Sequence, residues 1–140
     1  MTATAHRVPY RRYVRLAAAA FLLVTAYSVM SKLVQDRLAH DWLHSVLHVL
    51  SAAAAIYAGW LSRSSLPAHV FTLAVGIGYT LLGVLGWFIP GFFLHSVAAV
   101  PLDPAANVFH LVLGVPALTL VVLTRVDHRR HRRAGSAPVR

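Results

Sequence analysis

Cysteine and glutamate are absent from this chain, and charged residues of any kind are few. Without cysteine, disulfide bonds, thiolate metal ligands and cysteine nucleophiles are all excluded. Only 12% of the 140 residues are charged, whereas 58% are hydrophobic. Soluble domains carry about 25% charged residues. The composition therefore indicates a membrane protein.

Four apolar runs are each long enough to cross a bilayer core, which takes about 20 helical residues. They cover residues 13–34, 41–61, 70–89 and 103–124. Because lipid offers the backbone no hydrogen-bond partners, the runs are predicted to be helices, and their short connections predict antiparallel neighbours. We expect an all-α polytopic membrane protein with one four-helix transmembrane domain over residues 13–126.

Basic residues are concentrated outside the apolar runs. Ten of the thirteen Lys and Arg residues lie before residue 16 or after residue 124, and Arg63 lies in the second loop. Basic segments stay on the cytoplasmic side of a membrane. We expect basic cytoplasmic tails at 1–12 and 127–140, the second of them disordered. The predicted location is the cytoplasmic (inner) membrane, crossed by several spans, with both termini cytoplasmic.

A net charge of +9 also suits a nucleic-acid-binding protein. Here, however, the basic residues flank apolar runs and do not form a patch on a polar domain. Nucleic acid is therefore not an expected partner, and the lipid bilayer is.

The second and fourth apolar runs align when the chain is shifted by 62 positions. Asp41 then meets Asp103, and His48 meets His110. The pattern predicts two helical hairpins, about 13–63 and 70–125, repeated in the same topology. The alternative for the first run is a cleaved signal peptide, since it has a basic start and an apolar core. The repeat argues against cleavage because it gives this run a structural counterpart.

Two aspartates are predicted to begin helices. A carboxylate at the N-cap accepts hydrogen bonds from the free N–H groups of the first turn and complements the helix dipole. Asp41 and Asp103 stand at that position, and Pro104 suits the first helical residue because its missing N–H has no partner there anyway. Capping explains both aspartates without a role in catalysis.

Small residues recur at helical spacing in the apolar runs. Such residues let helices in a membrane approach one another closely. Helix packing is predicted at Ala52, Ala55, Gly83, Gly86, Gly114 and Ala117.

The histidines at 48 and 110 are unusual because each lies about two helical turns inside an apolar run. An ionisable side chain at that depth normally faces protein or water, not lipid. Each shares a helical face with small residues, so the two are predicted to point into the bundle interior, near each other. His44 lies one turn before His48 on the same face.

Several roles for these histidines stay open. A neutral imidazole can hydrogen-bond across helices, with Asn107, Ser45, Ser51 or Tyr27 as the available partners. A first-row metal can be held by His44, His48 and His110, with Asp41 as an oxygen ligand. Haem can be bound by one histidine from each helix, with Ala52 and Gly114 making room. A proton or ion pathway is the fourth possibility.

Helices three and four together resemble a known family. The segment "YTLLGVLGWF" followed by "DPAANVFHLVLGV" is similar to the small bacterial four-helix membrane proteins known as domain of unknown function 4383. The matching positions are Gly83, Gly86, Asp103, Asn107, His110 and Gly114. The resemblance implies four helices in a bacterial cytoplasmic membrane. It implies no established activity.

The serine and threonine residues lack any base-and-orienter arrangement, so an enzyme is not expected. The sequence predicts an accessory or scaffold subunit of the membrane, a homo-oligomer or part of a larger complex through its small-residue faces. The alternative is a module that binds or transports a metal, haem or protons through the histidines.

Overall fold

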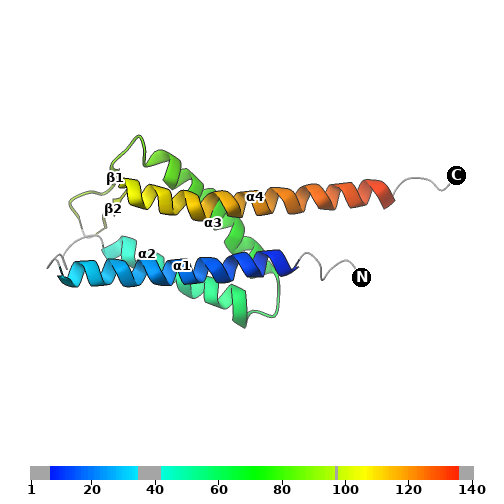
Figure 1. Cartoon of the computed structure of the whole chain (residues 1–140), viewed down its shortest axis with the longest axis horizontal. Helices are drawn as coiled ribbons and strands as arrows, with labels where there is room; N and C mark the ends of the chain where they lie inside the picture. Colours follow the sequence, from blue (N-terminus) through cyan, green and yellow to red (C-terminus); the bar gives the residue numbers. More distant parts are fainter. Residues whose placement is uncertain (1–6, 35–41, 97, 136–140) are drawn as a thin grey trace.

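The computed structural model describes residues 7–34, 42–96 and 98–135. Four long helices dominate it (Figure 1): α1 (Arg7–Val34), α2 (Trp42–Ile56), α3 (Leu66–Leu85) and α4 (Pro104–Gly135). All four are long and apolar enough to cross a membrane, with spans at Pro9–Val34, Trp42–Leu61, Leu66–Leu85 and Pro104–Asp127. The predicted all-α polytopic membrane fold is confirmed.

The helices pack as two pairs. α1 lies alongside α2, α3 crosses α4, and these pairings are the most extensive helix contacts in the described part of the chain (Figure 1). α1 begins and α4 ends at the same end of the bundle. The pairs correspond to the two predicted hairpins, whereas the proposed duplication stays a prediction.

The helix boundaries differ from the predicted runs. α1 begins at Arg7 and not at residue 13, and α3 begins and ends four residues earlier than predicted, with Pro67 in its first turn. The sequence predicted a disordered tail from residue 127, but α4 continues to Gly135. The prediction of disorder is therefore wrong for residues 127–135. Hydropathy marks only the lipid-embedded stretch. Arginine is also a good helix former and is favoured near a helix C terminus, so a helix can run beyond the lipid.

The second span does not stay α-helical to its end. Its last turn is a π-helix, η1 (Tyr57–Leu61), where a continuous helix was predicted. The Arg15 Nε donates to the Gly59 carbonyl at 3.0 Å, and an Arg11 Nη donates to the Ser62 carbonyl at 2.7 Å. Guanidinium groups thus satisfy carbonyls that a helix end leaves without partners. We call this end of the bundle the arginine end, after Arg11 and Arg15.

A two-stranded antiparallel sheet, not expected from the sequence, lies between α3 and α4. It pairs β1 (Gly91–Phe92) with β2 (Val100–Pro101). Gly91 has φ 136°, a conformation that side chains disfavour, and a Cβ there would lie 2.4 Å from the Val100 carbonyl oxygen. This turn therefore requires glycine.

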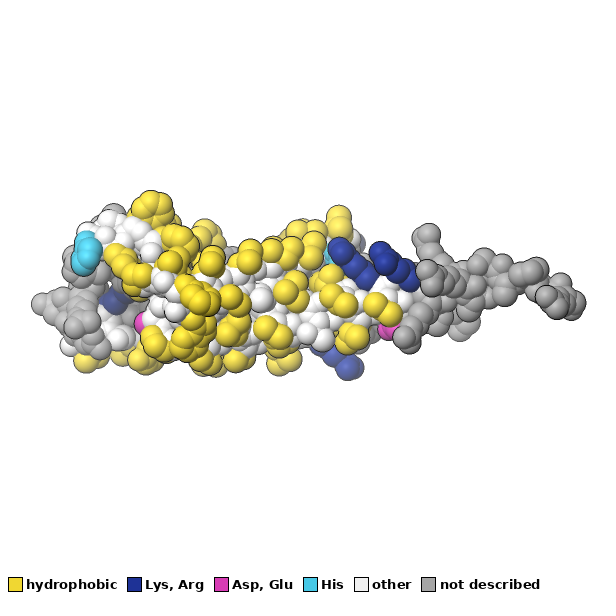
Figure 2. All heavy atoms as spheres, turned by 90° about the horizontal axis from the view of Figure 1, so that it is seen from above, with side chains coloured by type: hydrophobic (Ala, Val, Ile, Leu, Met, Phe, Trp, Pro, Cys, Tyr) yellow, Lys and Arg dark blue, Asp and Glu magenta, His cyan; other side chains and the backbone are white. Residues whose placement is uncertain are grey.

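Apolar side chains cover the sides of the bundle. Figure 2 shows them along most of the face it draws, with Lys and Arg side chains gathered mainly where α4 ends. Leu16 and Leu23 of α1 are each 72% exposed. Lipid tails are as apolar as leucine, so this exposure suits a bilayer and would be costly in water.

Phe21 of α1 occupies the centre of the bundle and is fully buried. Its ring makes edge contacts with Phe71 and Tyr79 of α3 and with Phe109 of α4, at centroid distances of 6.3, 5.4 and 6.0 Å. It also lies 6.1 Å from the ring of His48 on α2. One side chain therefore contacts all three other helices.

The small residues singled out in the sequence lie at helix interfaces. A Cβ on Gly114 of α4 would lie 2.5 Å from the Thr80 backbone nitrogen of α3. On Gly86 a Cβ would overlap the Asn107 side chain, and on Gly83 it would lie 2.7 Å from the Leu111 side chain. Ala52, Ala55 and Ala117 are buried. α3 and α4 can cross this closely because Gly83, Gly86 and Gly114 have no Cβ atom.

Substitution of Gly114 should therefore lower the stability of the bundle, whereas substitution of Gly78 should not. Gly114→Ala drives a methyl group into the α3 backbone and is expected to destabilise the bundle by about 1–3 kcal/mol. Nothing lies within 4 Å of a Cβ on Gly78. Gly78→Ala should thus be neutral or stabilising by up to about 1 kcal/mol. Unfolding in detergent, followed by circular dichroism, checks both; equal effects would contradict the close crossing.

Removal of the Phe21 ring should loosen all four helices. Phe21→Ala is expected to cost about 3 kcal/mol, the low end for a buried phenylalanine, because lipid removes part of the hydrophobic contribution. The matched control is Leu22→Ala, since Leu22 is 51% exposed on the same helix. The same unfolding measurement applies; a Phe21→Ala variant as stable as the control would show that the ring is dispensable.

Candidate metal centre

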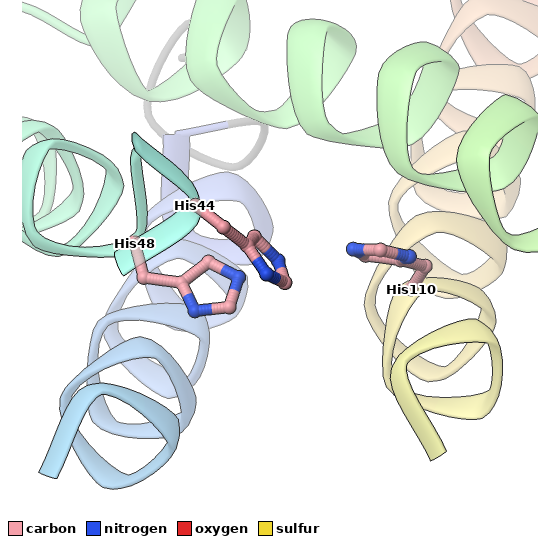
Figure 3. Close-up of side chains that lie close together, drawn as sticks. All are labelled: His44, His48 and His110. Carbon is pink, nitrogen blue, oxygen red and sulfur yellow. The ribbon is translucent and has the colours of Figure 1, made fainter. Parts of the chain in front are cut away.

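Three histidines from two helices meet inside the bundle. His44 and His48 lie on successive turns of α2, and His110 faces them from α4 (Figure 3). One ring nitrogen from each can be chosen so that all three lie within 4.8 Å of one another. The ring centroids of His44 and His48 are 4.4 Å apart, and those of His44 and His110 are 6.3 Å apart. The structure thus brings together the three residues that the sequence suggested as a ligand set.

The site is enclosed by aromatic side chains. His48 is 5% exposed and His110 is 2% exposed. The His48 ring contacts the rings of Phe21 and Phe109 on one side, at centroid distances of 6.1 and 5.8 Å, and the His110 ring meets the ring of Tyr79 edge-on at 5.0 Å. Neither ring faces lipid, as the helical spacing predicted.

Hydrogen bonding among the described residues does not account for the burial of the His48 imidazole. Both ring nitrogens of His48 lack a hydrogen-bond partner among the described residues, and so does Nδ1 of His110. Of the partners suggested by the sequence, Tyr27 is 73% exposed and the Ser45 hydroxyl accepts a bond from Lys32. Buried polar atoms usually have a partner, and those that lack one call for an explanation.

The other polar residues suggested by the sequence have separate positions. An Asp103 carboxylate oxygen accepts the Ala106 backbone N–H at 2.9 Å, the geometry of an N-cap. Asn107 is 1% exposed with its carboxamide against Gly86, and its Oδ1 has no partner among the residues described. Asp41, predicted as a cap and an oxygen ligand, lies outside the described residues, as does His40.

Lys32 is the residue near the site that the sequence did not reveal. It lies near the end of the first apolar run, and the structure places it in the last turn of α1, only 6% exposed. Its Nζ donates to the Ser45 hydroxyl and lies 5.1 Å from the centre of the Trp42 ring. Ser45 and His48 are three residues apart on one face of α2, so the ammonium lies on the same side as the cluster. The only signal was that Lys32 is the single lysine of the chain.

Three imidazole nitrogens form a donor set for a first-row transition metal. Imidazole suits zinc, copper, nickel and iron. Zinc takes nitrogen ligands at about 2.0–2.1 Å in a tetrahedral arrangement, and three protein ligands leave a fourth position for an exogenous ligand. The residues present fit such an ion, with two ligands from α2 and one from α4.

The chain was compared with protein-family models, curated proteins and solved structures. A family model described as "Domain of unknown function (DUF4383)" matches residues 38–123, which include the three histidines. The chain belongs to this family. The resemblance of helices three and four is thereby confirmed, and α1 lies outside the matched range. No curated protein and no solved structure matches.

Haem does not fit this DUF4383 protein in the way the sequence suggested. The macrocycle was expected to occupy room left by Ala52 and Gly114. Ala52 instead packs in a buried cluster with Phe21, and the face of Gly114 is filled by Thr80. Interiors are close-packed, and a porphyrin would have to displace a helix there.

Proposed function

We propose that this membrane protein is a non-enzymatic module that binds a first-row transition metal ion through His44, His48 and His110. The observation that carries the proposal is the meeting of three ring nitrogens within 4.8 Å of one another, from two helices. The buried His48 nitrogens, which have no hydrogen-bond partner among the described residues, support it. A bound ion would give those nitrogens the partner that burial otherwise denies them.

The distribution of apolar residues favours binding over conduction. His48 and His110 each lie six residues into their helices, about 9 Å from the helix start. Towards the arginine end the interior is filled by an apolar cluster that includes Val14, Ala55 and Val121. Apart from the Tyr10 hydroxyl, which is hydrogen-bonded to Thr124, the buried side chains of this cluster offer protons or ions no polar partners. The apolar cluster therefore favours a binding site that is reached from one end of the bundle, and argues against a conduction pathway that runs through the whole bundle.

Metal titration of the purified protein tests the proposal. The wild-type protein in detergent should bind one equivalent of Zn²⁺, and Co²⁺ in its place should give the visible absorption of a tetrahedral site. Loss of outer-shell partners alone typically costs 10–100-fold in metal affinity. His48→Ala and His110→Ala, which remove ligands, should therefore weaken binding by at least about 10-fold. His95→Ala is the matched control because His95 is exposed and outside the cluster.

Two results would count against a metal site. Equal affinity in His95→Ala and His110→Ala would place any binding elsewhere. A protein that takes up no Zn²⁺ or Co²⁺ and keeps a stable partner on gentle co-purification would favour the accessory or scaffold role instead.

We further propose that the arginine end is cytoplasmic, in the inner membrane of a bacterial cell. Exposed basic residues at this end support the orientation through the positive-inside rule. They come from α1, from the loop after η1 and from α4: Arg12, Arg63, Arg125 and Arg129. The histidine site would then open towards the outer leaflet.

Cysteine labelling tests the orientation. The natural chain has no cysteine, so a membrane-impermeant maleimide reacts only at an introduced site. Ser64 and Ser96 are exposed in the loops at opposite ends of α3. In spheroplasts, Ser96→Cys should be labelled directly and Ser64→Cys only after permeabilisation. The reverse pattern would place the arginine end outside.

A further inference from the structure

We infer that metal binding draws the α1–α2 pair and the α3–α4 pair together at the histidine end of the bundle, the end that holds His44, His48 and His110. The inference rests on the proposed metal site. It gives that site a consequence, because the ion becomes the link between two helix pairs.

The first argument is the size of the site. The three ring nitrogens lie within 4.8 Å of one another. Ligands of a tetrahedral zinc ion at about 2.05 Å are about 3.4 Å apart. The nitrogens must therefore approach one another by up to about 1.4 Å before all three can bind one ion.

The second argument is where the gap lies. His44 and His48 belong to one helix, and their rings are 4.4 Å apart, whereas His110 lies 6.3 Å from His44. Figure 3 shows the α2 pair on one side and His110 on the other. The distance to be closed therefore separates α2 from α4.

The third argument is that few direct contacts join α2 to α4, and the contact of the His48 ring with the Phe109 ring is one of them. The extensive contacts of the described helices are α1 with α2 and α3 with α4, and α2 has no comparable packing against α4. Rotation of the rings alone is restricted, because the His48 ring contacts both Phe21 and Phe109 and the His110 ring lies against Tyr79. Movement of one pair against the other is the less obstructed way to close the site.

The arginine end supplies a fixed point for this movement. There the Tyr10 hydroxyl is hydrogen-bonded to the Thr124 hydroxyl, which joins α1 to α4 directly. The Arg11 guanidinium joins α1 to the loop after η1 through the Ser62 carbonyl. With this end held, the pairs can pivot, and the displacement is largest at the histidine end.

Distances between spin labels measure the closure in the full-length protein. Because the chain has no cysteine, labels attach only at introduced positions. Val46→Cys on α2 and Val108→Cys on α4 report the histidine end, at residues 46% and 51% exposed. Leu61→Cys and Leu123→Cys, at residues 69% and 57% exposed, are the matched control at the arginine end. One equivalent of Zn²⁺ should shorten the first distance by about 1 Å and narrow its distribution, leaving the second unchanged.

The possible results separate the two proposals. Stoichiometric Zn²⁺ binding with no change in the first distance would overturn the closure and leave the metal site standing. Absence of Zn²⁺ binding in the unlabelled protein would overturn both. A shift that persists in His110→Ala would show that it does not arise at this site. If the labelled pair loses Zn²⁺ binding, Val49→Cys and Val112→Cys provide a second exposed pair on the same helices.

Discussion

The arrangement of this bundle depends on the contacts of one aromatic ring. Lipid exerts no hydrophobic force between helices, so their positions are decided by packing and by the few polar contacts they make. The Phe21 ring lies against Phe71, Tyr79 and Phe109 of two helices and beside His48 of a third. It orients α1 towards all of the others. The Phe109 and His48 rings that line the metal centre are therefore held by the same contact that centres the bundle.

The two ends of the bundle hold polar groups in different ways. At the arginine end, guanidinium and hydroxyl groups satisfy carbonyls and one another, so that α1, η1 and α4 are joined. At the histidine end, buried nitrogens of His48 and His110 have no hydrogen-bond partner among the described residues. Apart from the Arg11 Nε, which has no partner among the described residues, the polar groups named at the arginine end are paired, whereas the histidine end has groups suited to a ligand. This asymmetry is the physical basis for assigning binding to one end and structural support to the other.

Much of the fold could be predicted because it follows from local chemistry. Four apolar runs of spanning length give four helices, since no other structure satisfies the backbone in lipid. The Asp103 cap followed from residue type and position. The inward direction of His48 and His110 followed from their shared face with small residues. The π-turn of η1 was missed, and the Arg15 side chain that donates to its Gly59 carbonyl comes from another helix, so this contact leaves no pattern in the second apolar run. The extent of α4 was missed because hydropathy reports lipid contact and not helix length.

The sequence by itself determined the number of helices, their approximate spans and the side chains available to bind a metal. It also predicted that His48 and His110 lie near each other, but only the tertiary structure decided how closely the ring nitrogens meet and what surrounds them. His44 could be placed beside His48 by the α-helical repeat, but the approach of His110 depends on how α4 is rotated and where it crosses α3. That crossing is set by Gly114 against Thr80 and by Gly86 against Asn107, pairs from different helices. The contacts of Lys32 are instead with α2, and the space expected for haem is filled both by the packing of Ala52 with Phe21 and by Thr80 against Gly114. Contacts between distant parts of the chain leave no local pattern, so no reading of one helix at a time could reveal them.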